Sequence, residues 1–120
     1  MKLDHIVIML SDMENHFAFY EVLLPQLGFR KIREHVFVND EGNHLDFKQA
    51  PDADYCYRRY APGLNHIGFT AHSEAQLIEI KNIMANARFD VPEIQTFDEG
   101  RAIFFKDSDG MRIEVACYQS

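Results

Sequence analysis

The sequence has few cysteines, few basic residues and no long apolar run. Cys56 and Cys117 could pair in principle, but without an export signal we expect both thiols to be reduced and give neither a role. Twelve Lys and Arg against nineteen Asp and Glu leave a net charge of −7, which would repel a polyphosphate backbone. No apolar run approaches the ~20 residues that span a bilayer, and the first residues lack the order of a secretory signal. We therefore expect no nucleic acid and no membrane as partners, and a cytoplasmic location.

What is present is enough for one compact domain. The chain has 120 residues, of which 47% are hydrophobic, with ten Phe and five Tyr. This composition can build a core and argues against disorder.

The two halves of the chain resemble each other. The stretch Leu3-Asp4-His5-Ile6-Val7 recurs as Leu64-Asn65-His66-Ile67-Gly68, an apolar strand with a central histidine. Each half also closes alike, because Leu45-Asp46-Phe47 corresponds to Ile113-Glu114-Val115. The chain is therefore predicted to be a duplicated module with one histidine and one carboxylate in each copy.

Hydrophobic periodicity predicts the same order of elements in both copies. In the first copy, a capping box of Ser11 and Glu14 begins a helix that Gly28 ends. In the second, Ser73 and Gln76 form a weaker box. The predicted strands cover residues 2–9, 29–35, 36–38 and 44–49, and then 65–71, 92–96, 101–105 and 111–118.

These elements predict an α+β domain of residues 1–120 that consists of two βαβββ modules. The first module covers residues 1–51 and the second residues 64–120. Residues 52–63 contain a Pro-Gly pair and no clear periodicity, so we expect them to connect the modules.

The matched residues His5, Asp46, His66 and Glu114 are the side chains that a divalent metal site requires. Imidazole nitrogen and carboxylate oxygen are good ligands for first-row divalent ions, and two of each leave room for water or substrate. A single histidine in an apolar strand is more often a core residue, but its recurrence favours a ligand. A carboxylate flanked by Ile113 and Val115 must be exposed, paired or bound to metal.

Asp46 is the weakest member of this set, since it is one methylene shorter than a glutamate. His44 occupies the same strand face two residues earlier. A site of three ligands, His5, His66 and Glu114, with Asp46 acting through water or as a base, is nearly as plausible as a site of four.

The segments LDHIVI, FYEVLLPQLGFRK, PGLNHIGF, FFKDSDG and RIEVACY resemble the vicinal oxygen chelate superfamily of glyoxalase, bleomycin resistance and dioxygenase proteins. The resemblance covers nearly the whole chain. It implies paired βαβββ modules that form a curved mixed sheet around a metal, commonly in a homodimer. It places the metal positions on His5, Asp46, His66 and Glu114. Asp46 is a departure, because many metal-binding members have glutamate there.

The leading hypothesis is a metal-dependent, glyoxalase-like enzyme of the lyase or isomerase type. A divalent ion (Zn, Ni, Mn or Fe) would act as a Lewis acid on a small substrate that chelates it through two oxygens. Glu114 or Asp46 would move a proton at the carbon next to the carbonyl. The candidates for setting substrate choice at the cavity mouth are Tyr57, Arg58, Tyr60 and Arg101.

Two alternatives stay open. One is a metal-free protein that binds a small-molecule drug, as bleomycin-resistance members do. The other is an Fe(II)-dependent extradiol dioxygenase in which His5 or its neighbour, His66 and Glu114 form a facial triad. The matched His, Asp, His and Glu set favours the enzyme over the binding protein, which needs no ligands in matched positions.

Overall fold

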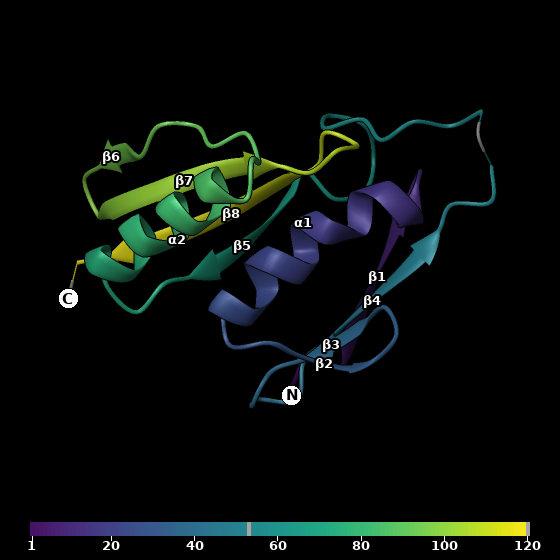
Figure 1. The fold of residues 1–120 in the computed structure, drawn as a ribbon, viewed down its shortest axis with the longest axis horizontal. Coiled ribbons are helices and arrows are strands. Elements are labelled where there is room, and N and C mark those ends of the chain that lie inside the picture. The colour runs from purple at the N-terminus through teal and green to yellow at the C-terminus, as the bar shows by residue number, and fades with distance from the viewer. Residues whose placement is uncertain (53, 120) are drawn as a thin grey trace. The chain divides into compact units, whose positions relative to one another are not determined.

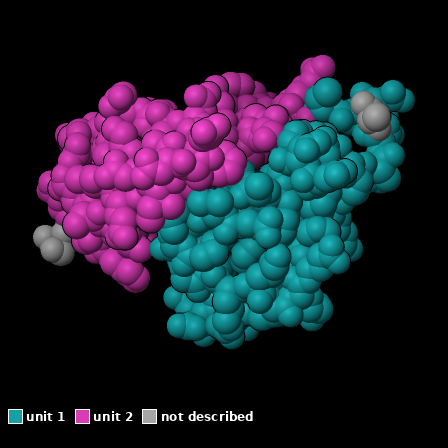
Figure 2. Space-filling model, viewed as in Figure 1, with its two compact units in different colours: residues 1–56 teal, residues 57–120 magenta. Residues whose placement is uncertain are grey.

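The computed structural model describes residues 1–52 and 54–119, and in it the chain divides into two compact units, residues 1–56 and 57–120 (Figure 2). We call them unit 1 and unit 2. Each has one helix and a four-stranded mixed sheet (Figure 1). The predicted α+β class and the doubled βαβββ order are confirmed. The predicted module boundaries, with a connection over 52–63, stay a prediction. In the described ranges, neither helix has the length and apolar character needed to cross a bilayer.

Unit 1 follows the predicted order closely. Its parallel pair, β1 and β4, is joined through the helix and a hairpin, as a parallel connection requires. The strand order is β1-β4-β3-β2. The elements are β1 (His5–Leu10), α1 (Met13–Gln26), β2 (Arg30–Arg33), β3 (Val36–Val38) and β4 (His44–Gln49).

Helix α1 begins one residue later than predicted. Its N-cap is Asp12, whose side chain accepts hydrogen bonds from the Asn15 backbone and side chain at 3.2 and 2.7 Å. The expected capping box of Ser11 and Glu14 is therefore wrong, because a carboxylate in the next position is an equally good acceptor for the free N–H groups of the first turn. The helix ends at Gln26, and Gly28 follows with φ of +88° as predicted.

The core of unit 1 is aromatic. Phe17 and Tyr20 of α1 pack on Phe47 of β4 with ring centroids 5.4 and 4.4 Å apart. Leu23 and Leu24 are fully buried beside them. This cluster fixes α1 on one face of the sheet and leaves the opposite face of β1 and β4 uncovered by the helix.

Unit 2 repeats this arrangement with the order β5-β8-β7-β6, in which β5 and β8 are parallel. Its elements are β5 (His66–Thr70), α2 (Glu74–Asn86), β6 (Gln95–Phe97), β7 (Gly100–Lys106) and β8 (Arg112–Tyr118). The strand expected over 92–96 begins only at Gln95, since Pro92 cannot donate a ladder hydrogen bond.

Ser73 caps α2 as predicted, accepting a hydrogen bond from the Gln76 backbone N–H at 3.1 Å. The Gln76 side chain reaches back to the His72 N–H instead of the Ser73 N–H. The core beneath α2 is mainly aliphatic. Its fully buried members include Leu77, Ile80, Met84, Ile103, Ile113 and Val115.

Candidate functional site

The predicted metal residues are divided between the two units. His5 and Asp46 belong to unit 1, and His66 and Glu114 belong to unit 2. In each unit the histidine begins one strand of the parallel pair and the carboxylate lies on the other strand, two residues past the position opposite the histidine. Side chains two residues apart share a sheet face. Each unit therefore presents one histidine and one carboxylate on the face that its helix does not cover.

In unit 2 these two side chains meet. The His66 Nε2 atom lies 3.5 Å from the Glu114 Oε1 atom, and the Glu114 side chain is only 18% exposed. Gly68 stands opposite Glu114 on β5, and a Cβ at Gly68 would lie 4.0 Å from the other carboxylate oxygen. The absence of a side chain at Gly68 leaves room for this carboxylate beside the imidazole.

The other ring nitrogen of His66 has a different partner. His66 Nδ1 lies 2.8 Å from the Asn65 Oδ1 atom. Asn65 is itself tied to the preceding segment, because its Nδ2 donates to the Arg59 carbonyl and its own carbonyl accepts from the Tyr57 hydroxyl at 2.7 Å. The imidazole is thus oriented through a network that begins in the connecting segment.

Unit 1 has the same register, but its histidine and its carboxylate have different surroundings. His5 Nδ1 lies 2.6 Å from Asp4 Oδ2, and this hydrogen bond lowers the pKa of Asp4. Asp46 stands opposite Val7, the counterpart of Gly68. Its Oδ1 atom is buried and has no hydrogen-bond partner within the described ranges. A buried carboxylate oxygen without a donor is costly in a folded protein unless a cation or water completes it.

Two further polar residues share these sheet faces. His44 lies directly opposite His5, and its Nδ1 is 3.0 Å from the Gly42 carbonyl oxygen. Arg112 lies directly opposite His66. Strand alternation in the sequence already places His44 on the face of Asp46, but a strand pattern does not reveal the register that sets His44 opposite His5 and Arg112 opposite His66. His44 adds a second imidazole on the face of unit 1, and Arg112 a positive charge on that of unit 2.

Arg101 lies on the opposite sheet face from Glu114, and the Tyr57 hydroxyl is held by backbone carbonyls. Arg101 is three residues from Phe104, which stands opposite Glu114, so it points to the helix-covered face, where it pairs with Glu74. Its candidate role in setting substrate choice stays a prediction. The Tyr57 hydroxyl is turned to the backbone carbonyls of Leu64 and Asn65.

No three His, Cys, Asp or Glu side chains are grouped closely enough to hold a metal ion in the part of the chain that the structure describes. Each unit by itself offers two of the four predicted residues. A site with three or four of them needs residues from a unit 1 and from a unit 2.

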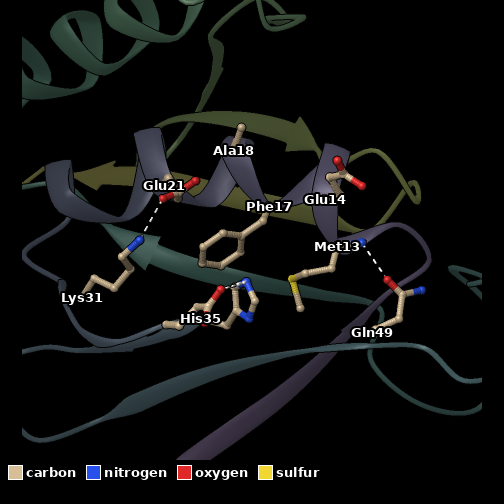
Figure 3. A pocket seen from close by; sticks show the side chains of 9 residues that line it. Met13, Glu14, Phe17, Ala18, Glu21, Lys31, His35 and Gln49 are labelled. Carbon is tan, nitrogen blue, oxygen red and sulfur yellow. Dashed lines mark hydrogen bonds and ion pairs between the residues drawn. The ribbon is translucent and has the colours of Figure 1, made fainter.

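A separate cavity of about 560 Å³ lies in unit 1 between α1 and the β2–β3 hairpin (Figure 3). Its lining includes the ion pair of Lys31 with Glu21 at 3.0 Å and the Phe17 ring, which meets His35 edge-on. None of the four predicted metal residues lines it.

A family model matches residues 2–115 of the chain. The chain belongs to the Glyoxalase/Bleomycin resistance protein/Dioxygenase superfamily. The resemblance inferred from the sequence is therefore confirmed.

Solved structures of this superfamily share the fold. A glyoxylase/bleomycin resistance protein/dioxygenase domain from Frankia sp. EAN1pec is 16% identical, with a TM-score of 0.81 over 100% of this chain and 93% of that chain. The fosfomycin resistance protein FosX from Listeria monocytogenes is 20% identical, with a TM-score of 0.73 over 99% and 94%. Lactoylglutathione lyase from Agrobacterium tumefaciens is 18% identical, with a TM-score of 0.65 over 97% and 92%. No curated protein matches the chain.

The four predicted residues have donor atoms of the types that bind divalent ions. The superfamily commonly uses such metals. Two imidazoles and two carboxylates form an N/O donor set of the kind that first-row divalent ions bind. The unpartnered Oδ1 of Asp46 and the carboxylate of Glu114 beside an imidazole are the two local features that a cation would stabilise.

Proposed function

We propose that the protein is a metal-dependent, glyoxalase-like enzyme of the lyase or isomerase type that acts on a small substrate with two adjacent oxygens. His5, Asp46, His66 and Glu114 would hold the ion. The observation that carries the proposal is the matched register: each unit sets a histidine and a carboxylate at equivalent places on equivalent strands. A duplicated core needs no such polar match, whereas a shared ion does.

A bound divalent ion would act as a Lewis acid on the substrate oxygens. The chain would supply the proton transfer. Glu114 is the better base, because it lies beside an imidazole on a partly buried face and can take a proton from the carbon next to a carbonyl and return it to the adjacent atom. Asp46 is the second candidate for this role, acting directly or through water.

We further propose a homodimer. Three apolar side chains near the start of unit 1 are well exposed. Leu3, just before β1, is 59% exposed, and Val7 and Met9, on the open face of β1, are 42% and 47% exposed. A sheet face that carries both metal residues and exposed apolar groups is suited to being covered by another βαβββ module. A homodimer supplies such a module from its second copy.

The test combines metal content with proton exchange. Protein purified without chelator is reconstituted with Zn, Ni, Mn or Fe, and its metal is counted by elemental analysis. Exchange of the hydrogen next to the carbonyl for deuterium is then followed by NMR in a panel of small α-hydroxy and α-oxo carbonyl compounds. We expect one ion per set of four residues and exchange only in the metal-loaded protein.

The variants His5→Ala and Glu114→Ala should retain much less metal than the natural protein after the same reconstitution, and both should lose exchange. Glu93→Ala is the matched control, because Glu93 is a carboxylate of the same unit that is 92% exposed and pairs with Lys81. A protein that takes up no divalent ion after reconstitution, yet binds aromatic or cationic drugs, would overturn the proposal in favour of a metal-free binding protein.

A further inference from the structure

The residue before each predicted metal-binding histidine is polar, and its side chain contacts the histidine ring. Asp4 Oδ2 lies 2.6 Å from His5 Nδ1, and Asn65 Oδ1 lies 2.8 Å from His66 Nδ1. Neighbours within a regular strand point to opposite faces and do not meet in this way. Asp4 and Asn65 each lie directly before the first residue of a strand, because β1 begins at His5 and β5 begins at His66.

In unit 2, the hydrogen bonds determine which ring nitrogen carries the proton. Asn65 Nδ2 must donate to the Arg59 carbonyl oxygen, which lies 2.9 Å away and can only accept. This bond fixes the orientation of the amide and turns its oxygen toward His66 Nδ1. Because an amide oxygen only accepts, the His66 Nδ1 atom must be the donor.

The same conclusion holds in unit 1. An ionised carboxylate only accepts hydrogen bonds, so His5 Nδ1 donates to Asp4. The backbone of Asp4 is held in turn, because its carbonyl accepts from the His44 N–H at 3.0 Å. This bond ties the residue before β1 to the start of β4.

A neutral imidazole with a proton on Nδ1 has its lone pair on Nε2. In unit 2, the Nε2 atom faces Glu114 at 3.5 Å. Ligating histidines in proteins commonly donate their other N–H to a carboxylate or carbonyl, which fixes the tautomer and the ring orientation.

We propose that Asp4 and Asn65 are positioning residues that hold His5 and His66 in the Nδ1–H tautomer, so that each ring offers Nε2 to a divalent ion. The proposal rests on the proposed function for the identity of the ligand. The tautomers themselves exist without metal, and this makes the two ideas separable. An unrestrained histidine in water favours the opposite tautomer, with the proton on Nε2.

The first measurement uses metal-free protein. Long-range 1H–15N correlation spectra at about pH 8, where imidazoles are neutral, distinguish the two tautomers of each histidine. We expect His5 and His66 to have the proton on Nδ1 in the natural protein. Asp4→Ala should convert His5 alone, and Asn65→Ala should convert His66 alone. His44 is the internal reference, because its Nδ1 partner is a backbone carbonyl that no substitution removes.

Conservative variants separate positioning from folding. Asn65→Asp keeps the oxygen that accepts from His66 but loses the donor to Arg59, so the tautomer should be retained. Asp4→Asn keeps an accepting oxygen without the charge and should also retain it. Asp40→Ala removes another exposed carboxylate of unit 1, 98% exposed against 80% for Asp4, that pairs with Arg30, and it should change neither histidine.

The second measurement is metal affinity by competition with a chelator. Asp4→Ala and Asn65→Ala should each weaken binding about 10- to 100-fold, and the conservative variants should recover most of it. If both alanine variants keep the Nδ1–H tautomer and full affinity, the positioning role is wrong while the proposed function stands. If the natural protein binds no metal but shows these tautomers, the proposed function fails. If the natural rings have the proton on Nε2, the inference fails whatever metal is bound.

Discussion

In unit 2 the histidine Nε2 and the carboxylate Oε1 lie 3.5 Å apart, whereas in unit 1 the Asp46 Oδ1 atom has no hydrogen-bond partner within the described residues. The register of the two strand pairs is the same. Two substitutions between the copies account for the difference. Unit 2 has the longer Glu114 and the small Gly68, and unit 1 has the shorter Asp46 and the bulkier Val7.

This comparison indicates that duplication fixed the positions of the polar pairs, and that side-chain length and the residue opposite decide how closely each pair meets. We infer that unit 2 is the better organised half of the proposed metal site. Unit 1 would contribute His5 and a carboxylate that reaches the ion less directly.

The largest expected effect comes from the carboxylate of unit 2. Glu114→Ala should weaken divalent metal binding by more than about 100-fold, because the loss of a ligand exceeds the 10- to 100-fold cost typical of a supporting residue. Asp46→Ala should cost about tenfold or less. The measurement is metal affinity by chelator competition, and equal losses in the two variants would contradict the ranking of the units.

An intermediate effect is expected from exchanging the residues that stand opposite the carboxylates. Gly68→Val gives unit 2 the side chain of unit 1, and its methyl groups would enter the space beside the Glu114 carboxylate. We expect metal binding to weaken about tenfold without loss of the folded state. Gly68→Ala is the control, because its Cβ would meet the carboxylate only at an ordinary contact distance of 4.0 Å. Unchanged affinity in the valine variant would show that the open space has no role.

The smallest effect concerns the helix caps, which also differ between the units. Asp12 caps α1 and Ser73 caps α2. The hydrogen bonds from Asn15 lower the pKa of Asp12. The ionised cap therefore stabilises unit 1 at pH values above the ordinary pKa of aspartate. This stabilisation is lost as the pH falls through the lowered pKa.

Asp12→Ala should therefore lower the melting temperature at neutral pH, and the difference should shrink toward about pH 3. Asp12→Asn keeps an accepting oxygen and should restore the cap without its pH dependence. Ser73→Ala should lower the melting temperature by an amount that does not vary with pH. Thermal melts followed by circular dichroism measure all three. A pH-independent effect of Asp12→Ala would contradict the assigned cap.

The repeated sequence pattern predicted more of the fold than of the candidate site. The periodicity of apolar residues placed both helices and the strands Val36–Val38 and His44–Gln49 correctly, because each of these elements has apolar side chains buried between helix and sheet. It misplaced the cap of α1, since Ser11 and Asp12 are both good acceptors and only the backbone path decides between them. It also placed the strand of Gln95–Phe97 too early, because these three residues are all exposed and provide no apolar pattern.

The supporting residues of the site could not be predicted. Asp4 and Asn65 stand next to the histidines in the sequence, and within a strand such neighbours point apart. Their contact with the rings depends on where the strand begins, which composition does not reveal. His44 and Arg112 required the register between parallel strands, and the Asn65 network required the path of the connecting segment.

The central claim is that one imidazole from each kind of unit binds the same ion. X-ray absorption spectra of the zinc-loaded protein count the imidazoles around the metal. We expect two imidazoles in the natural protein and one in each of His5→Ala and His66→Ala, measured at metal concentrations that saturate the variants. Two imidazoles that persist in either variant, or a metal bound through only one histidine in the natural protein, would contradict it.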